Sequence, residues 1–264
     1  MNPNEPRIKL EKRDGIGHLM FDNPARRNAI TLEMWQAIPP ILDDLAADDE
    51  IRVVLLCGAG KLAFISGADI SQFDGLRSDT QGLAQYDTAA RVAQERLYDF
   101  GKPTVAAIMG FCFGAGVSLA VCCDIRIAAR SARFSIPAGK LGLGYRAAGI
   151  RKLVDLIGPA RTMDLFYTAG VWSAADALAA GLVEHAVSDE EFDTFAADYC
   201  LRTAALAPLT LGAVKVAVRE IMRASDGYDH ERCERLALAC YSSEDYAEGR
   251  AAFREKRKPR FRGR

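Results

Sequence analysis

Two short runs of apolar residues, each followed by glycine and alanine, organise the first half of the chain. Residues 53–56 and 104–109 are apolar and rich in β-branched side chains. This pattern predicts two strands buried on both faces, because such strands have no polar side. The apolar run at residues 117–121 predicts the start of a helix packed against the second strand. Small residues then form the two junctions, Gly58-Ala59-Gly60 leading to residues 64–70, and Gly114-Ala115-Gly116.

Shorter patterns predict further elements on either side of these junctions. Residues 8–10 and 17–21 predict two short strands around a turn at residues 13–15. Thr31 has the position of a helix N-cap before an apolar helical face, and Pro39-Pro40 predicts a kink or break in that helix. Ser173 and Gly181 are typical of the two ends of a short helix over residues 174–180.

The pattern changes near residue 188. Before it, strand-like and helical runs alternate, which favours an α/β architecture. After it, residues 192–206, 211–223 and 230–240 predict helices without strands between them. We therefore assign residues 1–190 to an α/β core and residues 191–264 to a helical C-terminal region.

Composition restricts the classes of partner. Half of the 264 residues are hydrophobic, which is ample for one large domain, and the net charge of −1 provides no general attraction for nucleic acid or anionic membranes. No apolar run reaches the roughly 18 residues of a membrane span. Residues 1–14 are polar and charged, unlike a signal peptide. We expect no nucleic-acid partner and no membrane association.

The positions of cysteine and histidine bear on the cellular location of the protein and on metal binding. Four of the seven cysteines lie in apolar segments, at positions 57, 112, 122 and 123. This distribution is typical of reduced, buried thiols and predicts a cytoplasmic location. His18, His185 and His230 are scattered along the chain, so we expect no metal site.

The two glycine-rich junctions are the first candidates for chemistry. Small residues at a strand-to-helix junction leave backbone N–H groups uncovered at a helix N-terminus, where the helix dipole favours negative charge. Two such donors directed at one point form an oxyanion hole. Each junction taken alone is equally well explained as an ordinary turn.

Several short motifs follow one another in a specific order and spacing. They are residues 23–30 (NPARRNAI), 66–70 (SGADI), 102–107 (KPTVAA), 110–116 (GFCFGAG), 123–128 (CDIRIA), 181–183 (GLV) and 253–259 (FREKRKP). With them the chain resembles the enoyl-CoA hydratase/isomerase (crotonase) family over nearly all of its length. The resemblance implies a crotonase-like spiral of repeated ββα units, with C-terminal helices that cover the active site. It also implies homotrimers or homohexamers, an acyl-CoA substrate and no permanently bound cofactor.

The resemblance also implies site residues. The oxyanion donors are then the backbone N–H groups of Ala68 and Ala115. Arg26, Arg27 and Lys61 match positions where basic residues approach the coenzyme A phosphates. Other positions implied to contact coenzyme A are Ala63, Ile65, Ala68, Asp69 and Ile70, together with Phe253 and Lys256 of a C-terminal element that often reaches across a subunit boundary. Solvated surface charges are the alternative for the basic residues.

The chain departs from the family at the acidic positions. Hydratases of the family use two glutamates, and these positions hold Ser118 and Ala138, while a third acidic position holds Arg146. Alanine transfers no proton, and serine is a poor general base without a partner. Ser118 either positions a water molecule or is a small packing residue. Asp69 and Asp124 are interpreted as structural, so the usual two-glutamate hydration is not supported.

Tyr145 and Arg146 indicate a different reaction. Residues 141–150 resemble the corresponding segment of methylmalonyl-CoA decarboxylases, in which a tyrosine at the Tyr145 position holds the substrate carboxylate. Those relatives have a histidine where this chain has Ala68. Three hypotheses therefore stay open: an enoyl-CoA hydratase-like lyase, a decarboxylase of a malonyl-type thioester, and a non-catalytic acyl-CoA-binding protein. The alternative to a catalytic role for this pair is that Tyr145 shapes the pocket and Arg146 faces solvent or a neighbouring subunit.

Overall fold

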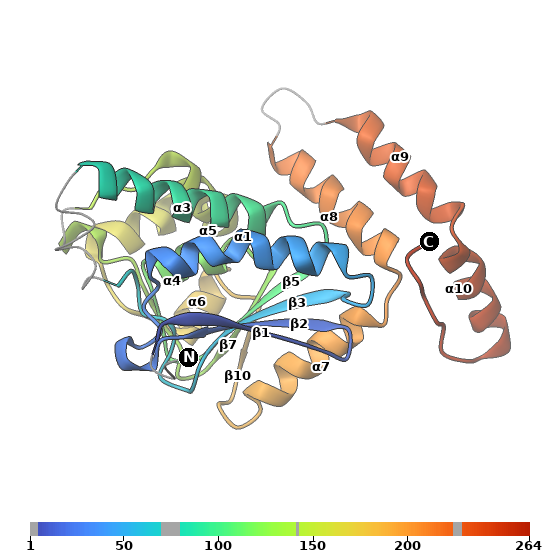
Figure 1. Cartoon of the computed structure of the whole chain (residues 1–264), viewed down its shortest axis with the longest axis horizontal. Coiled ribbons are helices and arrows are strands. Elements are labelled where there is room, and N and C mark those ends of the chain that lie inside the picture. Colours follow the sequence, from blue (N-terminus) through green and yellow to red (C-terminus); the bar gives the residue numbers. More distant parts are fainter. Residues whose placement is uncertain (1–4, 70–79, 141–142, 224–228) are drawn as a thin grey trace.

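Pairs of strands followed by a helix recur along the chain (Figure 1). The computed structural model describes residues 5–69, 80–140, 143–223 and 229–264. Within these residues the ββα units are β1 (Arg7–Arg13), β2 (Ile16–Asp22) and α1 (Leu32–Ala47); β3 (Val53–Gly58), β4 (Ala63–Ile65) and α3 (Thr80–Tyr98); β5 (Thr104–Ile108), β6 (Phe111–Phe113) and α4 (Ala115–Ala120); β7 (Ile125–Ala129), β8 (Arg133–Ser135) and α5 (Ala147–Thr168). A 3-10 turn, Pro24–Arg26, precedes α1 and another, Ala138–Lys140, precedes α5.

The strands form two sheets. The larger sheet has the order β1-β2-β3-β5-β7-β10, with β10 at His185–Val187, and the smaller has the order β4-β6-β8-β9, with β9 at Trp172–Ser173. All neighbours are parallel except β1 with β2 and β8 with β9. From β3 to β8, the first strand of each unit joins the larger sheet and the second joins the smaller. The predicted α/β class and spiral of ββα units are confirmed.

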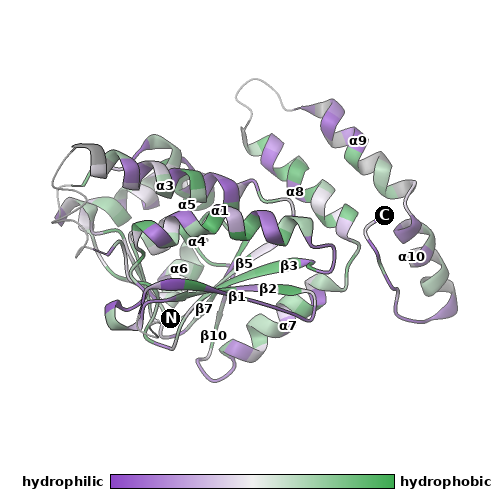
Figure 2. Cartoon of the chain, in the orientation of Figure 1, coloured by the Kyte–Doolittle hydropathy of each residue, from purple (hydrophilic) through white to green (hydrophobic). Residues whose placement is uncertain are grey.

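Apolar side chains on both faces of the larger sheet make the core. In β3, Val54 and Leu56 face one hydrophobic cluster while Val53 and Leu55 face another. The first cluster is covered by α1, α3 and α4, and the second by α7 (Phe192–Ala204) through Phe192 and other apolar residues. Figure 2 shows the resulting hydrophobic centre between helices with polar outer faces. Burial on both sides explains why these strands read as continuous apolar runs.

Local signals at the helix ends agree with the structure. The Thr31 hydroxyl accepts a hydrogen bond from the Met34 N–H at 3.2 Å, which caps α1. Ser173 and Asp176 form a reciprocal capping box at the start of α6 (Ala174–Ala180), and Gly181 ends that helix with a φ of 82°.

Cys112, Cys122 and Cys123 are buried free thiols, and burial raises the pKa of Cys122 to about 12.

The structure differs from the predicted elements at three places. Helix α1 runs without a break through Pro39 and Pro40, because its six buried side chains offset the lost hydrogen bonds, and a kink there stays a prediction. Strand β5 does not lead directly to α4, since β6 intervenes and belongs to the smaller sheet. A further helix, α10 (Glu244–Glu255), follows α8 (Pro208–Arg223) and α9 (His230–Tyr241).

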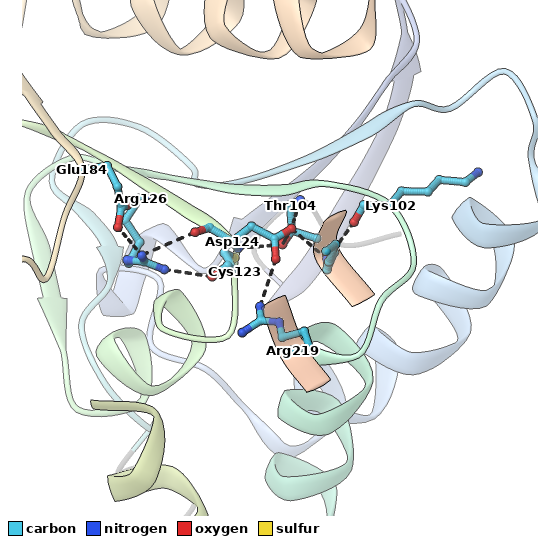
Figure 3. Close-up of polar contacts among 8 residues, drawn as sticks. Lys102, Thr104, Cys123, Asp124, Arg126, Glu184 and Arg219 are labelled. Carbon is cyan, nitrogen blue, oxygen red and sulfur yellow. Dashed lines mark hydrogen bonds and ion pairs between the residues drawn. The ribbon is translucent and has the colours of Figure 1, made fainter. Parts of the chain in front are cut away.

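Helix α8 is tied to the sheets by a partly buried charge network (Figure 3). Asp124, at the start of β7, accepts hydrogen bonds from Lys215 at 2.7 Å and Arg219 at 2.9 Å, both on α8. It also accepts from the backbone N–H and hydroxyl of Thr104, at 2.8 and 3.0 Å. Asp124 is therefore structural, as expected. Helices α9 and α10 extend beyond the sheets (Figure 1), and the proposed boundary at residue 190 stays a prediction.

Among the described residues, no single helix is long and apolar enough to cross a membrane; only α7 and α8 taken together reach that length and composition, and they meet at 103°.

Candidate functional site

A cavity of about 700 Å³ lies where the smaller sheet meets α3, α4 and α5. Its lining residues are Trp35 and members of the segments 66–68, 86–95, 113–118, 137–138 and 143–152, so it brings together positions far apart in the chain. Ala68, Ala115, Ser118, Ala138, Tyr145 and Arg146 all belong to its wall. The structure thus gathers all five residues predicted to be catalytic, and the alanine at a missing glutamate position, around one space.

Ala68 is held by an isolated parallel bridge to Ile30. The Ile30 N–H donates to the Gly67 carbonyl at 2.9 Å, and the Asp69 N–H donates to the Ile30 carbonyl at 2.9 Å. Because neighbouring residues of an extended segment direct their backbone groups to opposite sides, the Ala68 N–H points away from Ile30. Among the described residues, the Ala68 N–H donates to no protein acceptor.

Two buried asparagines hold the segment that positions Ile30. The Asn28 side chain donates to the carbonyls of Ala59 and Ala63, at 3.0 and 2.7 Å, and accepts from the Asn23 N–H. Asn23 in turn donates to the Ala29 carbonyl at 2.8 Å. The motif at residues 23–30 therefore ties the turn after β2 to β4, and through Ile30 it fixes Ala68.

Ala115 is the first residue of α4, with Gly114 as its N-cap. Gly114 has a φ of 50° and a ψ of −106°, a conformation open to glycine but not to other residues. A Cβ on Gly116 would lie 2.3 Å from the Ile65 carbonyl oxygen, so glycine allows α4 to approach β4 closely. Ala115 itself is helical, and its methyl group costs the backbone nothing. In the described part of the chain, its N–H has no protein acceptor.

The site therefore presents two unpaired backbone donors on the wall of one cavity. One comes from the extension of β4 and the other from the N-terminus of α4, where the helix dipole favours negative charge. Two N–H donors form an oxyanion hole where both are directed at one oxygen atom that carries or acquires negative charge.

Two hydroxyl groups lie beside these donors. An ideal Cβ on Gly114 would be 3.7 Å from the Tyr145 hydroxyl oxygen, which places the phenol at the N-terminus of α4. The Tyr145 ring packs edge-on against Phe166, with centroids 4.9 Å apart. Burial raises the pKa of Tyr145, and hydrogen bonding with the Ser118 side chain opposes that rise. Burial of the ring therefore favours the neutral phenol over the phenolate.

The charged groups of the cavity come from helices, and sequence analysis missed most of them. Asp87, Arg91 and Glu95 follow one another at four-residue spacing on α3. Asp87 accepts a hydrogen bond from Arg146 at 3.0 Å, and Arg91 donates to Glu95 at 2.8 Å. The spacing predicts a shared helical face, but nothing in the sequence shows that this face lines a cavity.

The residues expected to contact coenzyme A lie outside this wall, apart from Ala68. Arg26, Arg27 and Lys61 are exposed, and the Arg27 guanidinium lies 5.3 Å from the centroid of the Phe111 ring. Ala63, Ile65 and Asp69 are buried, so they offer a ligand only backbone groups. Lys256 is exposed, whereas Ile70 and the side chain of Phe253 lie outside the described residues. Among the residues described, no three of the His, Cys, Asp and Glu side chains are grouped to hold a metal ion.

Known proteins match this chain over nearly all of its length. The model of the family described as enoyl-CoA hydratase/isomerase matches residues 11–264. The chain is 32% identical to a probable enoyl-CoA hydratase of Mycobacterium tuberculosis and 31% identical to a crotonyl-CoA hydratase of Syntrophomonas wolfei. Each alignment covers 96% of this chain and 97% of the relative. A carnitinyl-CoA dehydratase of Salmonella arizonae is 31% identical, over 97% of this chain and 98% of that protein.

Solved structures are equally similar. An enoyl-CoA hydratase/carnitine racemase from Magnetospirillum magneticum superposes with a TM-score of 0.93 at 33% identity, covering 97% of this chain and 96% of that one. A family protein from Hyphomonas neptunium gives a TM-score of 0.92 at 31% identity, with 97% and 98% covered.

Fold and cavity together define a protein built from ββα repeats around a small-molecule site. The chain belongs to the enoyl-CoA hydratase/isomerase family, whose members act on acyl-CoA thioesters.

Proposed function

We propose that this chain binds an acyl-CoA thioester with its carbonyl oxygen between the N–H groups of Ala68 and Ala115. The observation that carries the proposal is that Ala68 and Ala115 line one cavity and that their N–H groups have no acceptor among the described residues. Negative charge that develops on the thioester oxygen is stabilised there, so an enolate forms at lower cost than in water. The enzyme class that fits best is an enoyl-CoA hydratase-like lyase.

By the resemblance to the family, Ser118 and Ala138 stand where its hydratases have two glutamates, and both residues line the cavity. We therefore assign proton transfer to the hydroxyl groups of Ser118 and Tyr145. In hydration, a water molecule held by Ser118 adds its hydroxyl group to the β-carbon, and its remaining proton passes to the Ser118 hydroxyl. Ser118 passes a proton on to Tyr145, and the neutral Tyr145 phenol delivers one to the α-carbon, so that both hydroxyl groups end as they began.

Decarboxylation is the second candidate, favoured by the position of Tyr145 beside Gly114. A carboxylate on the α-carbon then lies next to the phenol. The bond to this carboxylate breaks, carbon dioxide leaves, and the electron pair remains as an enolate at the same two N–H groups. No general base is required to begin this reaction, which suits a site without the two glutamates.

The exposed residues Arg26, Arg27 and Lys61 then bind the coenzyme A phosphates. Lys256 and Phe253 contribute from a neighbouring subunit of a homotrimer or homohexamer. Coenzyme A enters only as part of the substrate, without a permanently bound cofactor, and we expect the protein to act in the cytoplasm.

Mass spectrometry of a mixed thioester panel tests the proposal. Purified protein is incubated with enoyl-CoA and malonyl-type CoA thioesters, and the masses of the acyl groups are compared before and after. Gain of water supports the hydratase assignment, and loss of carbon dioxide supports the decarboxylase. Thioesters that bind but return unchanged would contradict both and leave an acyl-CoA-binding protein.

A further inference from the structure

The Asp87–Arg146 ion pair lies in the wall of the cavity and joins two different elements, α3 and the start of α5. Both residues line the cavity, and the Arg146 guanidinium donates to the Asp87 carboxylate at 3.0 Å. The Arg146 side chain is 73% exposed and the Asp87 side chain is 35% exposed. A guanidinium has five N–H donors, and this contact uses one of them. Arg146 therefore retains donors for a second carboxylate or can exchange its first.

This pair belongs to the acyl end of the cavity. The basic residues that fit the coenzyme phosphates, Arg26, Arg27 and Lys61, are all outside the cavity wall. Tyr145 approaches the N-terminus of α4, where the thioester oxygen binds, whereas the next residue, Arg146, reaches Asp87 on α3. A ligand group that meets Arg146 is therefore on the acyl chain, beyond the carbons next to the thioester.

We propose that the site takes acyl-CoA thioesters whose acyl chain ends in a carboxylate, and that this carboxylate replaces Asp87 on Arg146. The inference rests on the proposed thioester binding. A carboxylate and a guanidinium form strong, charge-assisted hydrogen bonds of defined geometry. The Asp87 side chain is itself a carboxylate bound to Arg146, and so it shows that Arg146 accepts a carboxylate at this place. Because Arg146 is largely exposed and Asp87 is only partly buried, the pair contributes little stability, and displacing Asp87 costs little.

Asp87 acts in this scheme as a competitor for the substrate carboxylate. Its charge repels an incoming anion, and it occupies one donor of Arg146. Removing the charge at position 87 therefore strengthens binding of a carboxylated chain but not of a plain one. This opposite effect of the two partners distinguishes recognition from a purely structural ion pair, in which both substitutions weaken the site.

Calorimetric titration of the full-length protein with matched thioesters tests the inference. Glutaryl-CoA is compared with pentanoyl-CoA, and adipyl-CoA with hexanoyl-CoA, so that each pair differs only at the end of the chain. The wild-type protein is expected to bind the carboxylated member about tenfold or more tightly, as one charge-assisted hydrogen bond provides. Arg146→Met should abolish this preference, and Asp87→Asn should increase it.

Arg91→Met is the matched control, since Arg91 lines the same cavity and pairs with Glu95 in a similar way. It should keep the preference. Equal binding of both members of a pair would overturn the inference while leaving the proposed function in place. A preference that survives Arg146→Met, or falls in Asp87→Asn, would also overturn it. Failure of every thioester to bind would instead contradict the proposed function itself.

Discussion

Replacing Asp124 by alanine should destabilise the whole fold, because this carboxylate joins α8 to the sheets. Asp124 accepts from Lys215, Arg219 and Thr104, at distances of 2.7 to 3.0 Å. The side chains of Asp124 and Lys215 are only 23% and 10% exposed. Burial lowers the pKa of Lys215 below its ordinary value of 10.5, and Asp124 opposes that shift by favouring the ammonium form. Asp124→Ala leaves this ammonium buried without a carboxylate.

The expected loss follows from that unpaired charge. Breaking a buried ion pair by removing one partner costs about 3–5 kcal/mol. Because each kcal/mol lowers the Tm of a chain of this size by about 2–4 °C, the Tm should fall by about 6–20 °C. Thermal unfolding followed by circular dichroism measures this change. Proteolysis under native conditions shows whether the region from α8 onward is released first.

Two further variants separate charge burial from simple loss of contacts. Asp124→Ala combined with Lys215→Met should be less destabilised than the sum of the single substitutions, since the second removes the stranded charge. Glu11→Ala is the exposed control: Glu11 pairs with Arg13 at 3.2 Å, both side chains are more than half exposed, and the loss should be less than about 1 kcal/mol. A change of similar size in Asp124→Ala and Glu11→Ala would refute the reasoning.

Three other predictions concern the site and the pH response. Ala115→Pro removes one of the two N–H groups at the first position of α4, where no helical hydrogen bond is lost, so kcat should fall by about 10²–10³-fold. Because Gly114 has a ψ of −106°, outside the range favoured before proline, circular dichroism and the Tm must show that the fold is retained. Ala147→Pro, at the first residue of α5, is the control for proline at a helix start and should retain activity. Tyr145→Phe should lower kcat while leaving the thioester Kd largely unchanged, and full activity would exclude the phenol from the reaction. The pKa of His18 is lowered from 6.5 by burial and by Arg13, so the unfolded chain binds a proton at His18 more readily than the folded chain does. The free energy of unfolding should therefore fall as the pH drops below about 6.5. Denaturant titrations of the wild type and of His18→Asn at several pH values check this, and the same dependence of the unfolding free energy on pH in both proteins would contradict it.

Helices and strands could be predicted from the sequence where local capping and hydrophobic patterns match the burial of those residues in the structure. Thr31 and Ser173 cap their helices as expected, since their hydroxyl groups satisfy N–H groups only a few residues away. Strands β3 and β5 are apolar throughout because both faces are covered. Strand β6 escaped prediction, since three residues between glycines show no periodicity and its partners lie in distant parts of the chain.

Some residues of the candidate site could also be predicted from the sequence, and others could not. Ala68 and Ala115 follow from motifs whose buried asparagines and close-packed glycines fix the backbone, and the structure brings both to one cavity. Asp87 did not emerge from the sequence, because its meaning depends on Arg146, which lies 59 residues further along the chain. Pairing of this kind depends on how α3 and α5 pack, and no local pattern records it.

The most direct test of the central claim is the carbonyl stretching frequency of a bound thioester. A thioester labelled with ¹³C at the carbonyl carbon is bound to the protein and observed by isotope-edited infrared difference spectroscopy. Two N–H groups that donate to the oxygen polarise the bond, so the band should lie at lower wavenumber than in water, and part of this shift should disappear in Ala115→Pro. A band of the bound thioester that remains at its frequency in water would contradict the assignment of Ala68 and Ala115 as the oxyanion donors.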